Sequence, residues 1–117
     1  MRVVVAPDKF KGTASASEIA KAVARAVREA GHEAVMVPMA DGGDGTLEAL
    51  GGPNRTTTVT GPTGEPVDAP WRLSKRLAVI EMALASGLVL AGGPEGNDPL
   101  NATTSGTGEL LDAAIAR

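Results

Sequence analysis

A strand–helix–strand pattern fills the first 39 residues and limits the folds open to this chain. The run Val3–Ala6 has no polar alternation and ends at Pro7, which predicts a fully buried strand. A second apolar run spans Ala34–Met39. With a helix between them, the two strands are predicted to be adjacent and parallel, joined by a right-handed crossover. The beginning of the chain is therefore expected to have an α/β fold.

The connecting helix has clear start and stop signals. Ser15 is followed by Glu18 at the spacing of a capping box, in which each side chain bonds to the other residue's backbone amide. Gly31 occupies the position at which helices often end in the left-handed conformation. Apolar residues recur at helical spacing on one face, at Ile19, Ala22, Val23, Ala26, Val27 and Ala30. This face is expected to pack against the strands.

Charged and glycine-rich segments follow both predicted strands. Asp8, Lys9 and Lys11 come after the first strand, and the segment Asp41–Thr46 comes after the second. The carboxyl ends of parallel strands meet at one edge of a sheet, where open α/β sheets bind ligands. We therefore expect the two segments to share one rim, with a short helix over Thr46–Leu50 beginning under the glycine-rich loop.

The glycine-rich loop carries two carboxylates, Asp41 and Asp44, separated by residues without side chains. Glycines let backbone amides approach an anion closely, and the carboxylates could hold Mg²⁺ through water or accept hydrogen bonds from substrate hydroxyls. The plainer alternative is a tight turn with solvated side chains. A lysine beside this loop, Lys9 or Lys11, can meet a phosphate or carboxylate as a point charge or can simply be solvated.

The second half of the chain has a different pattern, which begins after a Gly-Gly-Pro-Asn breaker at residues 51–54. Three short runs predict a small antiparallel β unit, and they span Thr56–Thr60, Val67–Leu73 and Leu77–Met82. Within this unit, Pro66 and Pro70 indicate edge positions, because proline cannot donate a ladder hydrogen bond.

The end of the chain is predicted to hold two loops and a helix. The loops cover Gly92–Asn97 and Thr103–Gly108, and the helix has an apolar face made by Leu110, Leu111, Ala114 and Ile115. Ser105, Gly106 and Thr107 lie at the start of this helix, where they suit either an anion or the capping of the helix. No returning strand follows, so either this helix ends the fold or the chain is cut short, and we expect an incomplete fold.

Composition argues against several classes of protein. The net charge is −3, from 11 basic and 14 acidic side chains without a basic run, which argues against binding to nucleic acid phosphates. No apolar run reaches about 18 residues and no signal peptide is evident, so we expect no membrane association and a cytoplasmic location. The chain has no cysteine, which excludes disulfide and thiolate chemistry.

Known ligand-binding fingerprints also fail. Both partial G-x-G-x-x-G matches have another residue at the last glycine position, Glu48 in one and Leu111 in the other, and the chain has no P-loop motif. Gly43 stands where a calcium loop beginning at Asp41 would need its second ligand. His32, the single histidine, falls in a turn far from the rim and is expected to be an exposed surface residue.

Four stretches, taken together and in order, resemble the N-terminal part of the bacterial type 1 glycerate kinases. They are Ala6–Thr13, Ala40–Thr46, Val79–Leu88 and Asn97–Leu110, and Thr58–Val67 also matches. The resemblance implies a Rossmann-like α/β domain with a second α/β domain inserted in it. Residues 1–54 are then the N-terminal part of the first domain, and 55–117 are the beginning of the inserted β-containing lobe with the final helix.

The resemblance implies an enzyme that phosphorylates D-glycerate with ATP and Mg²⁺. From residue chemistry we expect catalytic roles for Lys11, Asp41 and Asp44, with Lys11 neutralising phosphate or the glycerate carboxylate and either aspartate holding Mg²⁺ or orienting the hydroxyl. Further residues are expected to bind substrate or phosphate, namely Asp8, Lys9, Gly42, Gly43, Gly45, Thr46, Ser105, Gly106 and Thr107.

Members of that family are much longer and continue into a strand and a glycine-rich phosphate-binding loop, which this sequence lacks. We therefore expect a partner in the missing C-terminal part or in a second copy of the chain. The alternative is a truncated, non-catalytic module that binds a small hydroxy acid or anion without converting it.

Overall fold

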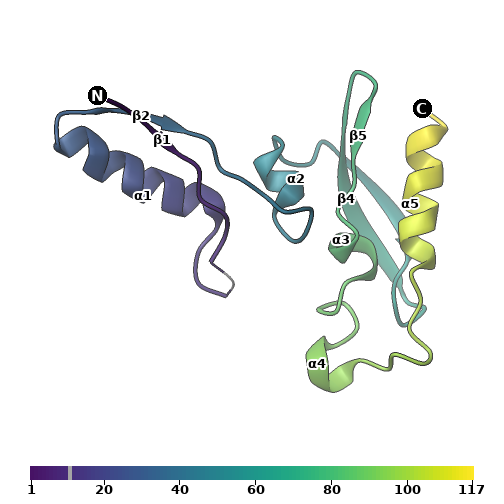
Figure 1. The fold of residues 1–117 in the computed structure, drawn as a ribbon. Helices are drawn as coiled ribbons and strands as arrows, with labels where there is room; N and C mark the ends of the chain where they lie inside the picture. Colours follow the sequence, from purple (N-terminus) through teal and green to yellow (C-terminus); the bar gives the residue numbers. More distant parts are fainter. Residues whose placement is uncertain (11) are drawn as a thin grey trace. The chain divides into compact units, whose positions relative to one another are not determined.

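The computed structural model describes residues 1–10 and 12–117. Within them the chain forms two compact units, Met1–Ala49 and Leu50–Arg117 (Figure 1). The first unit holds the strand–helix–strand pattern, and the second holds the β-rich segment and the final helix. The mixed α/β class is confirmed, with a parallel pair of strands in one unit and a separate antiparallel sheet in the other. The assignment of 1–54 and 55–117 to a Rossmann-like domain and an inserted lobe stays a prediction.

The first unit contains β1 (Arg2–Val5), α1 (Ala16–Glu29), β2 (Glu33–Met36) and α2 (Thr46–Ala49). Strands β1 and β2 are parallel and adjacent, and Val3 pairs with Ala34, which confirms the predicted pairing. Helix α1 contacts both strands and buries Ala20 and Ala24. The packing face predicted for this helix is wrong in large part, since Val23 is 43% exposed and Ala22, Ala26 and Ala30 are exposed as well, while Ile19 and Val27 are half-buried. A sheet of two strands covers only a narrow stripe of the helix, and that stripe is centred on Ala20 and Ala24.

The capping box at the start of α1 is confirmed. The Ser15 hydroxyl accepts from the Glu18 N–H at 3.2 Å, and the Glu18 carboxylate accepts from the Ser15 N–H at 2.8 Å. Hydrogen bonds from the backbone and side chain of Ser15, with a smaller contribution from the charge of Lys21, lower the pKa of Glu18. At the other end of the helix, Gly31 has a φ of 80°, as its predicted role requires.

The prediction of a fully buried first strand is wrong. Val5 is buried, but Val4 is 63% exposed. A strand without polar alternation is typical of sheets covered on both faces. Among the described residues, this sheet has two strands and one packed helix, which do not bury both faces. The second strand is also shorter than predicted, since it ends at Met36.

The second unit contains three strands and three helices. They are β3 (Arg55–Thr60), β4 (Pro66–Ser74), β5 (Leu77–Val79), α3 (Ala83–Ser86), α4 (Gly93–Gly96) and α5 (Ser105–Ile115). The strands form an antiparallel sheet in the order β3-β4-β5, which confirms the predicted unit. Helices α5 and α3 pack on the sheet, and the core of this unit is built from Val59, Ala69, Trp71, Ala85 and Leu110.

Pro66 and Pro70 do not mark an edge strand, because β4 is the central strand of its sheet. However, β5 pairs only with Arg72–Ser74, so the stretch of β4 that holds both prolines pairs with β3 alone. A residue without a backbone N–H is tolerated at such a position, since no second strand accepts from it. The prolines therefore identified a half-paired stretch and not an edge strand.

Two predicted loops contain helix. Helix α4 lies inside the stretch 92–97, with a proline in its first turn, and α5 begins at Ser105, inside the stretch 103–108. The apolar face of α5 is only partly covered, since Leu110 is buried while Ile115 is 83% exposed. Within the described residues, no helix has both the length and the apolar character needed to cross a bilayer.

Candidate functional site

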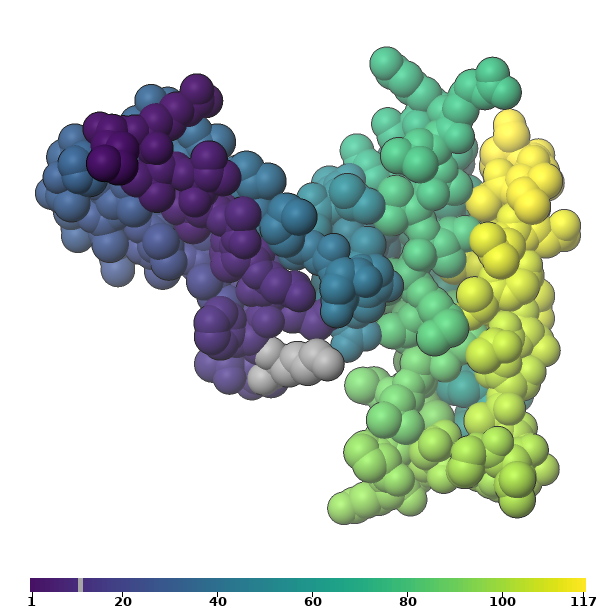
Figure 2. Space-filling view, viewed as in Figure 1, coloured from purple at the N-terminus to yellow at the C-terminus, as the bar shows by residue number. Residues whose placement is uncertain are grey.

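The pairing of β1 with β2 continues past the ends of both strands. The Val37 N–H donates to the Val5 carbonyl at 2.8 Å, and the Met39 N–H donates to the Pro7 carbonyl at 2.9 Å. These two bonds hold the segments side by side up to the point where the charged residues begin. The loop after β1 and the glycine-rich loop therefore start next to each other. Figure 2 shows both segments, in purple and blue, at the surface of the first unit.

The glycine-rich loop is held in shape by its own hydrogen bonds. One carboxylate oxygen of Asp41 accepts from the Gly43 N–H at 2.9 Å, and the Gly43 carbonyl accepts from the Thr46 N–H and hydroxyl at 3.1 and 2.6 Å. Gly42 and Gly45 have φ of 93° and 90°, in the left-handed region that disfavours residues with a Cβ. The glycines thus allow a tight turn that leads directly into α2.

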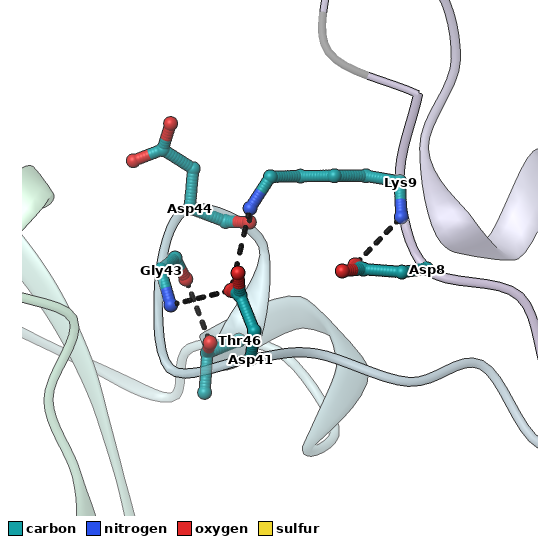
Figure 3. Close-up of polar contacts among 6 residues, drawn as sticks. All are labelled: Asp8, Lys9, Asp41, Gly43, Asp44 and Thr46. Atoms are coloured by element: carbon teal, nitrogen blue, oxygen red, sulfur yellow. Dashed lines mark hydrogen bonds and ion pairs between the residues drawn. The ribbon is translucent and has the colours of Figure 1, made fainter.

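Lys9 reaches from the first loop to the second (Figure 3). Its ammonium donates to the backbone carbonyl of Asp44 and lies 3.8 Å from the carboxylate of Asp41. Its own backbone N–H donates to the Asp8 carboxylate at 2.7 Å. In the same view, the Asp44 carboxylate points away from Lys9 and from Asp41. The loop presents a backbone carbonyl and one carboxylate to the lysine, and it directs the second carboxylate elsewhere.

A cavity of about 450 Å³ lies beside these loops within the first unit. Its lining mixes charged, hydroxyl and apolar groups, and the described residues that form it include Lys9, Phe10, Ser15, Met39, Asp44 and Glu48. A volume of this order is within the usual range for small-molecule sites, which combine an apolar wall with a few convergent polar groups. The first unit therefore contains a small-molecule-sized cavity at the rim predicted from the strand ends.

The rim brings together most of the predicted site residues. Figure 3 shows six of them in one cluster, and all six belong to the two predicted rim segments, namely Asp8, Lys9, Asp41, Gly43, Asp44 and Thr46. Gly42 and Gly45 belong to the same loop. Lys11, expected to be catalytic, lies outside the described residues. The exposed position expected for His32 is confirmed.

Ser105, Gly106 and Thr107 belong to the second unit, where they form the first turn of α5 and not a loop. The Ser105 N–H donates to the hydroxyl of Thr103 at 3.1 Å, and the hydroxyls of Thr107 and Ser86 bond at 2.8 Å. A Cβ on Gly106 would lie 2.1 Å from the Thr60 carbonyl oxygen. The N-cap residue of α5, Thr104, makes no side-chain hydrogen bond to the first turn, so the contacts favour a packing role for this segment over the binding of an anion.

Asp41 and Asp44 do not fit a magnesium site that both would share. Their carboxylates diverge (Figure 3), and the ammonium of Lys9 lies beside Asp41, where its charge opposes a second cation. No group of three or more histidine, cysteine, aspartate or glutamate side chains suitable for a metal ion occurs among the described residues. The arrangement therefore fits a hydrogen-bonding role for these carboxylates better than joint metal ligation.

The cavity includes residues that sequence reasoning did not place in the site. Phe10 and Met39 provide apolar walls, and Glu48 adds a carboxylate from α2. A signal was present for Phe10, which is one of two aromatic residues in the chain and stands between two lysines. For Glu48 the sequence offers only a departure from a dinucleotide fingerprint. Its place on the cavity depends on the position of α2 relative to the loop after β1, which no local pattern gives.

The model of the glycerate kinase family matches residues 3–117. The chain belongs to the glycerate kinase family. It is 48% identical to the glycerate 2-kinase of Escherichia coli (strain K12) and 45% identical to the glycerate kinase of Bacillus subtilis (strain 168). Each match covers 98% of this chain and 32% of the relative.

A solved structure is also similar to this glycerate kinase family chain. The crystal structure of a candidate glycerate kinase 2 from Salmonella typhimurium LT2 matches with a TM-score of 0.81 and 43% identity, and the match covers 99% of this chain and 33% of that one. The chain thus spans about a third of the length of the relatives that it matches. The resemblance found in the sequence motifs is confirmed at the level of the family.

Proposed function

We propose that the loops after β1 and β2 form part of a site that transfers a phosphoryl group from ATP to D-glycerate. The observation that carries this proposal is the cluster of Lys9, Asp41 and Asp44 beside the cavity in the first unit. Membership of the glycerate kinase family supports the reaction type and the substrate. On this proposal, the 117 residues supply the acceptor side of the site as the N-terminal portion of a kinase.

Phosphoryl transfer asks mainly for positioning and charge neutralisation. Asp44, whose carboxylate points away from Lys9, is proposed to accept a hydrogen bond from a glycerate hydroxyl. Lys11 is proposed to neutralise the glycerate carboxylate or a phosphate. ATP, accompanied by Mg²⁺, supplies the phosphoryl group. Because the carboxylates of Asp41 and Asp44 diverge, we assign them the part of orienting the acceptor and not that of holding this ion jointly.

A second candidate function is a non-catalytic module that binds a small hydroxy acid or anion. The observation in its favour is that all described residues lining the cavity lie within the first unit, whereas the chain spans about a third of its relatives. Under this alternative the cavity binds D-glycerate, and the chain alone does not turn it over.

Calorimetric titration of this chain with D-glycerate, and separately with ATP and Mg²⁺, distinguishes the two functions. Binding of both ligands together with ATP-dependent formation of phosphoglycerate supports the kinase. Binding of D-glycerate without ATP binding or turnover supports the module. L-Glycerate serves as the control ligand, because a specific acceptor site discriminates between the two enantiomers. Absence of D-glycerate binding contradicts both functions for this chain.

A further inference from the structure

We propose that Lys9 is a positioning residue that fixes the glycine-rich loop 41–46 against the loop after β1, and that it does not contact phosphate or substrate. The proposal rests on the proposed function for its catalytic consequence, but the structural link itself does not depend on any activity. It revises the role expected from the sequence, in which Lys9 was a substrate- or phosphate-binding residue.

The first argument comes from what already surrounds the ammonium of Lys9. An ammonium group has three N–H donors. Here it donates to the Asp44 carbonyl and faces the Asp41 carboxylate at 3.8 Å, so both ends of the glycine turn are bound to one group. The side chain of Lys9 is only 17% exposed, which is unusual for lysine.

The second argument comes from close packing along the lysine side chain. A Cβ placed on Gly43 would lie 3.5 Å from Lys9 Nζ and 3.1 Å from the Asp41 carboxylate oxygen. A Cβ on Gly45 would lie 3.9 Å from Cδ of Lys9. The lysine thus lies along the glycine backbone, with its stem near Gly45 and its head near Gly43. This arrangement engages the ammonium with the loop, on the wall of the cavity that Lys9 helps to line.

The third argument is that Lys9 is itself anchored at its backbone end. Its N–H donates to the Asp8 carboxylate, and the preceding Pro7 carbonyl accepts from Met39 in the continuation of the sheet pairing. Because the lysine is held at the sheet edge and bonds to Asp44, it fixes the turn, 35 residues away in sequence, relative to that edge. The turn's internal bonds set its local shape, and Lys9 adds a side-chain link that sets its place beside the first loop.

The catalytic consequence follows from the sensitivity of phosphoryl transfer to alignment. A displacement of about 1 Å in a positioned group can reduce the rate about 100-fold. Lys9 would act by keeping the carboxylate of Asp44 where the acceptor hydroxyl arrives. This role explains why a lysine, whose stem is long and whose head is a compact charge, occupies a position that spans two loops.

The test measures backbone order in the glycine-rich loop of this chain by ¹⁵N relaxation. Four proteins are compared: the wild type, Lys9→Met, Lys9→Arg and Lys21→Met. Methionine keeps an apolar stem and removes the charge, arginine keeps donors for the carbonyl and the carboxylate, and Lys21 is an exposed lysine on α1 that serves as the matched control. D-Glycerate is titrated into each protein in the same experiment.

We expect wild-type order parameters of about 0.85 for residues 42–46, and a fall below about 0.6 in Lys9→Met while α1 keeps its values. Lys9→Arg should restore the order of the loop, and Lys21→Met should leave it unchanged. Unchanged loop order in Lys9→Met overturns the proposal. Loss of order throughout β1, α1 and β2 also overturns it, because Lys9 would then serve general stability. If the wild type fails to bind D-glycerate, the proposed function fails, while the loop order still decides the role of Lys9.

Discussion

The carboxylate of Glu109 accepts a hydrogen bond from the backbone N–H of Thr60 at 2.9 Å, which ties helix α5 to the last residue of strand β3. Hydrogen bonds from the side chain and backbone of Thr60 lower the pKa of Glu109 below its ordinary value of 4.5. A carboxyl whose pKa is lower in the folded state stabilises that state above the unfolded pKa, and this stabilisation is lost as the pH falls through the folded pKa.

The first prediction follows from that sign. As the pH falls below about 4.5, the second unit should lose stability in the wild type. Glu109→Gln should show a flatter dependence over the same range, because glutamine does not titrate. Melting temperatures recorded from pH 6 down to pH 3, an interval of about three units around that pKa, give the comparison. Glu95→Gln, at an exposed position of α4, is the control, and an equal flattening there would contradict the assignment to Glu109.

The second prediction concerns the spacing between α5 and β3. Gly106→Ala should destabilise the chain by about 1–3 kcal/mol or more, because the added methyl would meet the Thr60 carbonyl oxygen at 2.1 Å. Gly108→Ala is the matched control on the same helix, since nothing lies within 4 Å of its Cβ position. That variant should gain about 0.5–1 kcal/mol from helix propensity.

Denaturant unfolding followed by the fluorescence of Trp71, which is buried in the core of the second unit, measures both glycine variants. A stable Gly106→Ala protein would show that α5 does not need this close approach. In that case, the binding of an anion would again become the better explanation for a glycine in the first turn of the helix.

The third prediction concerns the start of α1. Ser15→Ala should reduce the stability of the first unit by about 1 kcal/mol, because the cap of the first-turn amides is lost. Ser15→Asp should retain most of it, since aspartate caps equally well. The free energy of unfolding of the three proteins, followed by helix circular dichroism, tests this. Equal stability of the alanine and aspartate variants would contradict a stabilising cap.

The fourth prediction concerns catalysis in a full-length family member that carries the same rim residues. Asp44→Ala and Lys11→Ala should each lower kcat/KM about 10²–10³-fold, the range found for the loss of a preorganised electrostatic contact. Asp44→Ala should change stability by only about 0.5 kcal/mol, because the exposed side chain of Asp44 contributes little to a core, and we expect a change of about the same size for Lys11→Ala.

An ATP-dependent assay of glycerate phosphorylation and thermal melting, applied to the same preparations, provide the comparison for this prediction. The equivalent of Asp112→Ala, at an exposed position of α5, is the control. Turnover close to that of the wild type would remove the substituted residue from the site. A melting loss that matches the activity loss would assign it a structural role instead.

Local signals in the sequence predicted the elements that depend on them. The capping box at Ser15 and the helical spacing after it were enough to place α1, and a helix between two apolar runs was enough to predict the parallel pair. The position of Pro70 in a central strand was not predictable, because it depends on how far β5 extends along β4. Propensity also failed at α4, where a Gly-Pro-Glu-Gly segment forms a helical turn.

The candidate site divides in the same way. The rim that joins Lys9 to Asp41 followed from the parallel strands, since topology brings their carboxyl ends together. The contact of the lysine with the Asp44 carbonyl was not predictable, because a sequence gives residue types and not the direction of a backbone group. The place of Glu48 on the cavity was likewise not predictable, because it depends on the tertiary position of α2 and not on the residues next to Glu48 in sequence.

All the described residues that line the cavity lie between Asp8 and Ala49, so none comes from the second unit. During synthesis, the N-terminal part of a chain leaves the ribosome first and folds first. The described lining of the cavity can therefore assemble while β3 to β5 are still being translated, once the parallel pair β1–β2 has formed around α1. In the order of synthesis, the cavity can thus form before the second unit has folded.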